Sequence, residues 1–152
     1  MAARARPAPL GREAFAAFVP VTSRWSDNDS YGHINNAAYF LFFDSAINAL
    51  LVEAGLLDPA ASDLIGLTAS NSCDYFSSLA FPEAVEVGVA VEHIGASSVG
   101  YRVGAFRAGA LTASAQGRFV HVYVTRAGQR PAPIPPGHRA HLEELRRAEI
   151  AA

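Results

Sequence analysis

The sequence predicts an α+β domain in which an antiparallel β-sheet wraps around one long, buried α-helix. The helix is predicted over residues 36–54, because this stretch contains neither Pro nor Gly and is apolar on nearly all sides. Several strands are predicted after residue 64, where apolar residues begin to recur at every second position. The breaks at residues 95–96 and 108–109 are short, so neighbouring strands are expected to run antiparallel.

The first strand and the ends of the helix carry local signals. Residues 15–25 alternate loosely around Pro20, which indicates an edge-like or bulged strand. Asn35 or Asn36 is expected to cap the start of the helix, because an Asn side chain can accept from free amides of the first turn. Gly55 stands where a helix commonly ends in the left-handed conformation.

The rest of the chain is predicted to complete one domain over residues 1–152. Residues 57–63 form a connection, and residues 1–13 read as a flexible tail. An amphipathic C-terminal helix is expected over residues 136–150. The remaining strands are expected over residues 64–76, 84–93, 97–107 and 111–124.

Composition limits the possible classes of protein. A chain with 51% hydrophobic and 17% charged residues is typical of a compact globule, and a net charge of -2 gives no support to nucleic-acid binding. Cys73 is the only cysteine, so the chain has no intrachain disulfide and a cytoplasmic location is expected. Asp44 in the middle of the helix argues against a membrane span. The histidines are scattered, apart from His138 and His141 near the C-terminus, so neither a metal nor a cofactor is expected.

A polar loop over residues 24–36 leads directly into the apolar helix. It places hydrogen-bonding groups at a buried helix N-terminus, where free amides and the helix dipole favour a developing negative charge. Asp27 and Asp29 lie two positions apart, so their side chains point away from one another if the loop is locally extended. Asp27 is therefore expected to be structural and to pair with Arg24.

The motif Asp27-x-Asp29-x-x-Gly32-His33-Ile34-Asn35-Asn36-x-x-Tyr39, followed by Asp44, resembles that of the 4-hydroxybenzoyl-CoA thioesterase family of hotdog-fold acyl-CoA thioesterases. Further landmarks of the resemblance are Phe81-Pro82, the hairpin at residues 95–98 and the run at residues 134–136. The resemblance implies a hotdog fold and hydrolysis of an acyl-CoA to free acid and CoA. It also implies a homodimer or homotetramer with active sites at subunit interfaces.

The resemblance assigns catalytic roles to three residues. Asp29 matches the catalytic aspartate, acting either as a nucleophile or as a general base towards water. The backbone amide of Asn36 matches the oxyanion donor, and His33 is expected to donate a hydrogen bond or to position the thioester. The simpler alternatives are an Asx-turn for Asp29 and a ring that only braces the turn at Gly32 for His33.

Five further residues are expected to bind substrate. They are Asn35, Tyr39, Asp44, Ser97 and Ser98. Asp44 alternatively braces a neighbouring strand or subunit, and it is also the reserve candidate for the catalytic acid. The Asn35 side chain is favoured as a cap, Tyr39 as a core residue, and the two serines could simply form a turn.

Two other functions stay open. One is a non-catalytic protein that binds acyl-CoA or acyl-carrier protein and keeps the motif as structure. The other is a hotdog hydratase or dehydratase, which needs a histidine and a carboxylate placed for proton transfer to carbon. Acyl-CoA is the expected substrate, with acyl-carrier protein as the alternative carrier of the acyl group.

Overall fold

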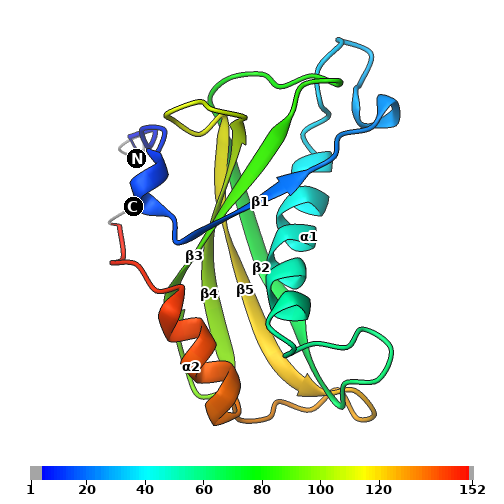
Figure 1. Cartoon of the computed structure of the whole chain (residues 1–152), viewed down its shortest axis with the longest axis vertical. Helices are drawn as coiled ribbons and strands as arrows, with labels where there is room; N and C mark the ends of the chain where they lie inside the picture. Colours follow the sequence, from blue (N-terminus) through cyan, green and yellow to red (C-terminus); the bar gives the residue numbers. More distant parts are fainter. Residues whose placement is uncertain (1–4, 151–152) are drawn as a thin grey trace.

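The computed structural model describes residues 5–150, and it contains five strands, two α-helices and two short 3-10 helices in that range (Figure 1). The 3-10 helices are η1 (Arg12–Ala14) and η2 (Trp25–Asp27). The α-helices are α1 (Ala38–Glu53) and α2 (Pro136–Glu144). The strands are β1 (Ala17–Val21), β2 (Leu64–Tyr75), β3 (Val85–Ile94), β4 (Ser98–Arg107) and β5 (Ala115–Thr125).

The strands form one antiparallel sheet in the order β1-β3-β4-β5-β2. Short hairpin connections join β3 to β4 and β4 to β5, as their sequence breaks predict. The long connections place β1 and β2 at the two edges of the sheet. In Figure 1 the sheet curves along α1, which runs down one of its faces. The expected hotdog architecture, a curved antiparallel sheet around one long helix, is therefore confirmed.

The core lies between α1 and the sheet. Four valines at alternate positions of β3 point to the same face and are fully buried there: Val85, Val87, Val89 and Val91. They pack in one cluster with the buried side of α1, which contributes Phe42, Phe43, Ala46 and Ile47. The helix ends as expected, because Gly55 has a positive φ of 71°.

The N-terminal segment differs from the expected flexible tail over residues 1–13, of which residues 1–4 lie outside the described part. Leu10 donates its N–H to the Gln116 side chain, and Gln116 in turn donates to the Ala8 carbonyl. Arg12 forms an ion pair with Glu86 at 2.6 Å. Residues 8–13 thus contact the outer face of the sheet through hydrogen bonds and an ion pair, at positions where the sequence predicts a flexible tail.

The C-terminal helix is shorter than the expected residues 136–150. It ends at Glu144, and the next residues lie beside β3, where Val91 bonds to both Leu145 and Arg147 through its main chain. The reason is the short first strand: pairing between β1 and β3 stops at the Ala17–Val89 pair. The backbone of β3 beyond that point needs another partner, and the C-terminal segment supplies it.

Candidate active site

Asp27 anchors the polar loop. Its buried carboxylate accepts the N–H of Arg24 at 2.7 Å and pairs with the Arg24 guanidinium at 2.7 Å. The hydrogen bond from that guanidinium lowers the pKa of Asp27, despite the opposing effect of burial. The Asp27 carbonyl also accepts the N–H of Asn35 at 2.8 Å. The expected structural pair of Asp27 with Arg24 is confirmed.

Asp29 begins a tight turn that ends at Ile34. The Asp29 N–H donates to the His33 carbonyl at 2.8 Å, and Gly32 supplies the positive φ of 79° that the turn requires. One carboxylate oxygen of Asp29 accepts the Tyr31 N–H at 2.8 Å, which is the Asx-turn given above as the simpler alternative to a catalytic role. Within residues 5–150 this is the only hydrogen bond of the half-buried carboxylate, so its second oxygen keeps its capacity to react.

The side chain of His33 is exposed on this turn. Its carbonyl braces the turn through the Asp29 N–H, whereas its ring forms no hydrogen bond in the described part of the chain. The structure therefore does not show the simpler alternative, in which the His33 ring only braces the turn at Gly32. The imidazole instead stays open to solvent on the same turn as Asp29.

Asn35 and Asn36 connect the turn to α1. The Asn35 side chain accepts the Ala37 N–H at 2.9 Å, as expected for a cap, although α1 is assigned only from Ala38. The Asn36 carbonyl accepts from the Tyr75 hydroxyl at 2.9 Å. The N–H of Asn36 donates to no acceptor among residues 5–150. A free amide thus lies at the entrance of a long helix, on the same loop as Asp29.

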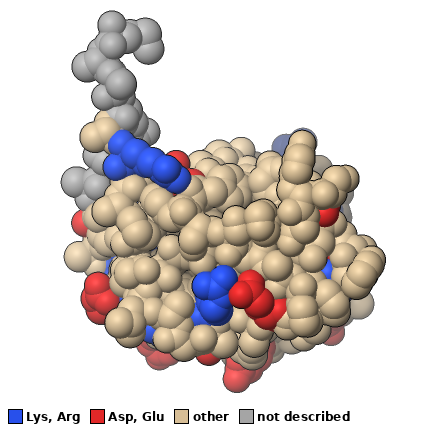
Figure 2. Space-filling view, turned by 90° about the horizontal axis from the view of Figure 1, so that it is seen from above, with Lys and Arg blue, Asp and Glu red and all other residues tan. Residues whose placement is uncertain are grey.

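A second loop locks this region in place. Ile34 donates its N–H to the Leu79 carbonyl at 2.8 Å, and the Asn28 side chain accepts the N–H of Phe81 at 3.0 Å. Trp25 packs edge-on against Phe81 but stays 82% exposed. Figure 2 views this end of the molecule, whose surface is mostly uncharged, with a basic and an acidic side chain adjacent near its middle. The candidate site therefore lies at an open, weakly charged end of the fold.

Tyr39 and Asp44 occupy different surroundings on α1. Tyr39 is 3% exposed and packs with Phe42 and Phe43, so the structure places it in the core. Asp44 is half-buried and accepts a hydrogen bond from the Asn48 side chain at 3.2 Å. The charge of Asp44 also acts on His121, a buried histidine of β5. Burial lowers the pKa of His121, and the charge of Asp44 opposes that effect.

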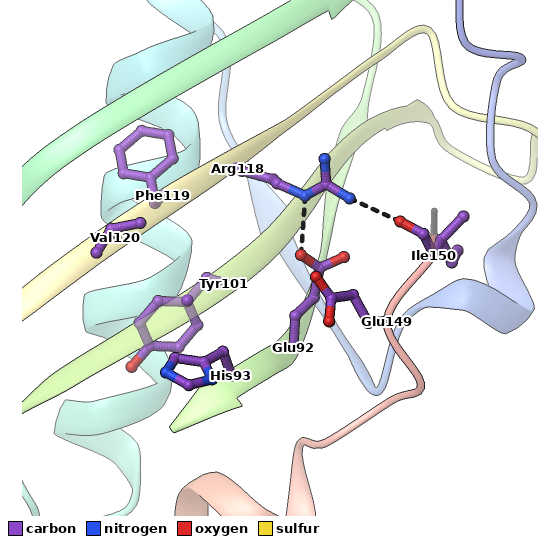
Figure 3. A pocket seen from close by; sticks show the side chains of 9 residues that line it. Glu92, His93, Tyr101, Arg118, Phe119, Val120, Glu149 and Ile150 are labelled. Atoms are coloured by element: carbon purple, nitrogen blue, oxygen red, sulfur yellow. Dashed lines mark hydrogen bonds and ion pairs between the residues drawn. The ribbon is translucent and has the colours of Figure 1, made fainter. Parts of the chain in front are cut away.

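The four arginines on β4 and β5 or at their ends all have acceptors within the chain. Arg102 and Arg118 both pair with Glu92 on the outer face of the sheet. A hollow of about 320 Å³ lies at this place, and Figure 3 shows how Arg118, which lines it, reaches both Glu92 and the Ile150 carbonyl. Arg107 pairs with Glu83, and Arg126 donates to carbonyls of the connection before β2. This hollow is on the face opposite α1, away from the polar loop.

Comparison with known proteins identifies the family. The family model described as the thioesterase-like superfamily matches residues 23–142, which include the polar loop, α1 and all of β2 to β5. The chain belongs to the thioesterase-like superfamily. A crystal structure of the PA5185 protein of Pseudomonas aeruginosa strain PAO1 superposes with a TM-score of 0.90 at 45% identity, covering 93% of this chain and 100% of that one.

Two further proteins extend this comparison. A thioesterase from Thermus thermophilus, solved with coenzyme A and zinc, is 28% identical with a TM-score of 0.72, covering 88% of this chain and 96% of that one. The YsmA protein of Bacillus subtilis (strain 168) is 25% identical over 88 residues, which are 58% of this chain. The chain spans 59% of the length of that curated relative. Residues 5–150 contain no group of three or more His, Cys, Asp or Glu side chains placed to hold a metal ion.

In this member of the thioesterase-like superfamily, the expected site residues do not all come together. Ser97 and Ser98 form the hairpin at the start of β4, whereas the loop with Asp29 lies beyond the other end of that strand (Figure 1). The hairpin is fixed instead by its own surroundings, since Ser97 accepts the N–H of Tyr123 and Ala96 accepts that of Ile134. One chain therefore gathers Asp29, His33, Asn35 and Asn36, but not the two serines.

Cys73 is the only cysteine of the chain. Burial raises the pKa of Cys73 to about 11, so this residue is a neutral thiol near pH 7 and does not resemble an activated nucleophile.

No helix in residues 5–150 has the length and apolar character needed to cross a membrane.

Proposed function

We propose that this chain is an acyl-CoA thioesterase that hydrolyses the thioester to a free acid and CoA. The observation that carries the proposal is the unpaired N–H of Asn36 at the entrance of α1, on the loop that also holds Asp29. An unpaired amide at a helix start, reinforced by the helix dipole, suits the oxygen of a thioester carbonyl as it gains negative charge. Asp29 supplies a carboxylate with one oxygen outside the Asx-turn.

The proposed reaction begins when the thioester carbonyl oxygen accepts a hydrogen bond from Asn36 N–H. In the nucleophilic route, Asp29 attacks the carbonyl carbon, the carbon–sulfur bond breaks, and the CoA thiolate leaves and takes up a proton. Water then cleaves the mixed anhydride and restores the carboxylate. In the general-base route, Asp29 takes a proton from water while that water attacks the same carbon; the carbon–sulfur bond then breaks, and the CoA thiolate leaves and takes up the proton held by Asp29. In both routes His33 donates a hydrogen bond to the reacting thioester.

We further propose that the functional unit is a homodimer, or a homotetramer built from it. β2 lies at an edge of the sheet with no strand on its outer side within the described chain, and its residues 67–72 are exposed. Such an edge is a template for pairing with another strand. A second copy would also supply the Ser97 and Ser98 hairpin that one chain holds far from its own Asp29. CoA is the proposed carrier, with acyl-carrier protein as the alternative.

A hydratase finds less support in the same structure. That reaction needs a histidine and a carboxylate that both reach the substrate carbon. The charge of Asp44 acts on His121, but this histidine is 1% exposed, and burial lowers its pKa. His33 is exposed, but it lies on the same loop as Asp29 and the free Asn36 N–H, and these two groups suit hydrolysis.

The test is a thiol-release assay on wild type and Asp29→Asn with benzoyl-, short-chain and long-chain acyl-CoA. We expect wild type to hydrolyse at least one of these and the variant to lose at least ~100-fold in kcat, as for a positioned acid–base group. Asp63→Asn is the matched control, because it makes the same change at an exposed aspartate before the start of β2. Equal rates in wild type and Asp29→Asn would contradict the role of Asp29 and shift attention to Asp44. Binding of acyl-CoA without turnover would favour the non-catalytic alternative.

A further inference from the structure

Tyr75 links the end of β2 to the entrance of α1. It is the last residue of that strand, and its hydroxyl donates to the Asn36 carbonyl at 2.9 Å. Its ring packs edge-on against Tyr39, with the ring centroids 5.3 Å apart. Because Tyr39 is buried in the core, the Tyr75 ring rests on a fixed surface. The hydroxyl is therefore held in one position relative to the helix.

Without Tyr75, the Asn36 carbonyl would have no hydrogen-bond partner among the described residues. The Asn36 carbonyl precedes the regular hydrogen-bond ladder of α1, which is assigned from Ala38. Among the described residues, the Tyr75 hydroxyl is the only donor to this carbonyl. Asn35, the residue before Asn36, is held by the Asp27 carbonyl. Asn36 is thus fixed on both sides while its own N–H stays free.

The hydroxyl of Tyr75 stays protonated over the whole neutral range. Burial raises the pKa of Tyr75 far above its ordinary value, and the neighbouring Cys73 adds to this effect. Cys73 lies two residues earlier on the same face of β2 and is itself a neutral thiol. The proton of the Tyr75 hydroxyl is therefore always available to the Asn36 carbonyl.

We propose that Tyr75 is a positioning residue of the active site, which holds Asn36 so that the free N–H of this residue stays aimed at the developing oxyanion. The inference rests on the proposed thioesterase function. Tyr75 acts through Asn36, because its one donor proton is already committed to the Asn36 carbonyl. The oxyanion forms only in the transition state, so loss of this positioning lowers kcat and leaves substrate binding nearly unchanged.

The kinetic test compares Tyr75→Phe with Tyr123→Phe. Both variants delete a tyrosine hydroxyl, but the Tyr123 hydroxyl is buried and has no hydrogen-bond partner in the described chain. We expect Tyr75→Phe to lower kcat about tenfold with KM within about twofold, since removal of an oxyanion donor itself costs about 100-fold or more. Tyr123→Phe should keep the wild-type kcat. Wild-type kcat in Tyr75→Phe, or a rise in KM alone, would overturn the inference.

A second measurement separates this inference from the proposed function. Backbone ¹⁵N relaxation and amide exchange of Asn36 are compared in wild type and Tyr75→Phe, with Gly32 as the internal reference on the same loop. We expect greater mobility and faster exchange at Asn36 in the variant, and no change at Gly32. Unchanged Asn36 dynamics would overturn the positioning role even if the wild-type protein is an active thioesterase. A wild type that hydrolyses no thioester would refute the proposed function, and the same spectra would still decide whether Tyr75 holds Asn36.

Discussion

Asn36 contributes its main chain rather than its side chain to the candidate site. Its side chain is exposed, and the cap of the turn before α1 is the side chain of Asn35. The free N–H and the carbonyl bound by Tyr75 are both backbone groups. A substitution that keeps the backbone N–H should therefore be tolerated far better than one that removes it.

Asn36→Pro tests this idea by deleting only the donor among the backbone groups. Proline is tolerated just before a helix, where its missing N–H has no intrahelical partner. We expect kcat to fall by about 100-fold or more, the cost of losing one oxyanion donor. Asn36→Ala is the matched control and should keep most of the activity in the thiol-release assay. Comparable activity in the two variants would show that this N–H takes no part in the reaction.

Asp27 and Asp29 are two nearby carboxylates in different surroundings. Asp27 is 4% exposed and has its charge balanced by Arg24. Asp29 is half-buried, and only a single backbone amide donates to its carboxylate within residues 5–150. A buried, fully paired carboxylate is a poor nucleophile or base, whereas the less paired one is available for chemistry.

The two ends of helix α1 differ: the N-terminal end lies at the candidate site, and the C-terminal end is followed by Gly55. Its N-terminal end presents the free amide, and its C-terminal end turns through Gly55 in the left-handed conformation. The packed side of the helix fixes its position, because Phe43, Ala46 and Ile47 are fully or almost fully buried. Changes at Gly55 should therefore affect stability much more than catalysis.

Gly55→Ala should lower the free energy of unfolding by about 1 kcal/mol, the cost of placing a side chain in the left-handed region. No steric clash adds to this cost, since a Cβ at Gly55 would meet nothing within 4 Å. Gly137→Ala is the control, because that position in α2 is equally open but has no positive φ. We expect Gly137→Ala to be neutral or slightly stabilising in denaturant unfolding. Equal destabilisation by both variants would contradict the conformational explanation.

In the described part of the chain, the candidate site is open to solvent and no strand pairs with the outer edge of β2. Tyr31 is 86% exposed on the loop of Asp29, and Leu67 is 39% exposed on β2. The Ser97 and Ser98 hairpin lies at the opposite end of β4 from the loop. The proposed dimer through β2 would account both for the uncovered strand and for the distance of the Ser97 and Ser98 hairpin from the loop.

Leu67→Arg tests this dimer. A new positive charge on β2 of each copy would place two like charges on the paired edges of the proposed dimer, and like charges across paired strands are destabilising. We expect a shift to monomer in analytical ultracentrifugation together with at least about tenfold lower hydrolysis at the same protein concentration, since association and completion of the site are coupled. Leu111→Arg is the control, because Leu111 is 80% exposed but lies outside every strand. A monomeric wild type with full activity would refute the dimer.

The sequence by itself determined the local parts of this protein. The apolar stretch without Pro or Gly specified α1, alternation specified β3, and the motif from Asp27 to Asn36 located the loop that carries the candidate site. The Asp27–Arg24 pair was predictable too, because its partners are three residues apart. Such features follow from propensity and spacing, which act over a few residues.

Only the tertiary structure decided the contacts between distant segments. In the folded chain, residues 8–13 lie on the sheet and α2 ends at Glu144. The Ser97 and Ser98 hairpin lies away from Asp29. The tertiary structure also joined Tyr75 to Asn36, a pair with no signal in the sequence beyond the alternation of β2. These outcomes depend on which unpaired backbone groups and which surfaces meet once the sheet has formed. The order and register of the strands determine which groups and surfaces meet, and no local sequence pattern encodes this order and register.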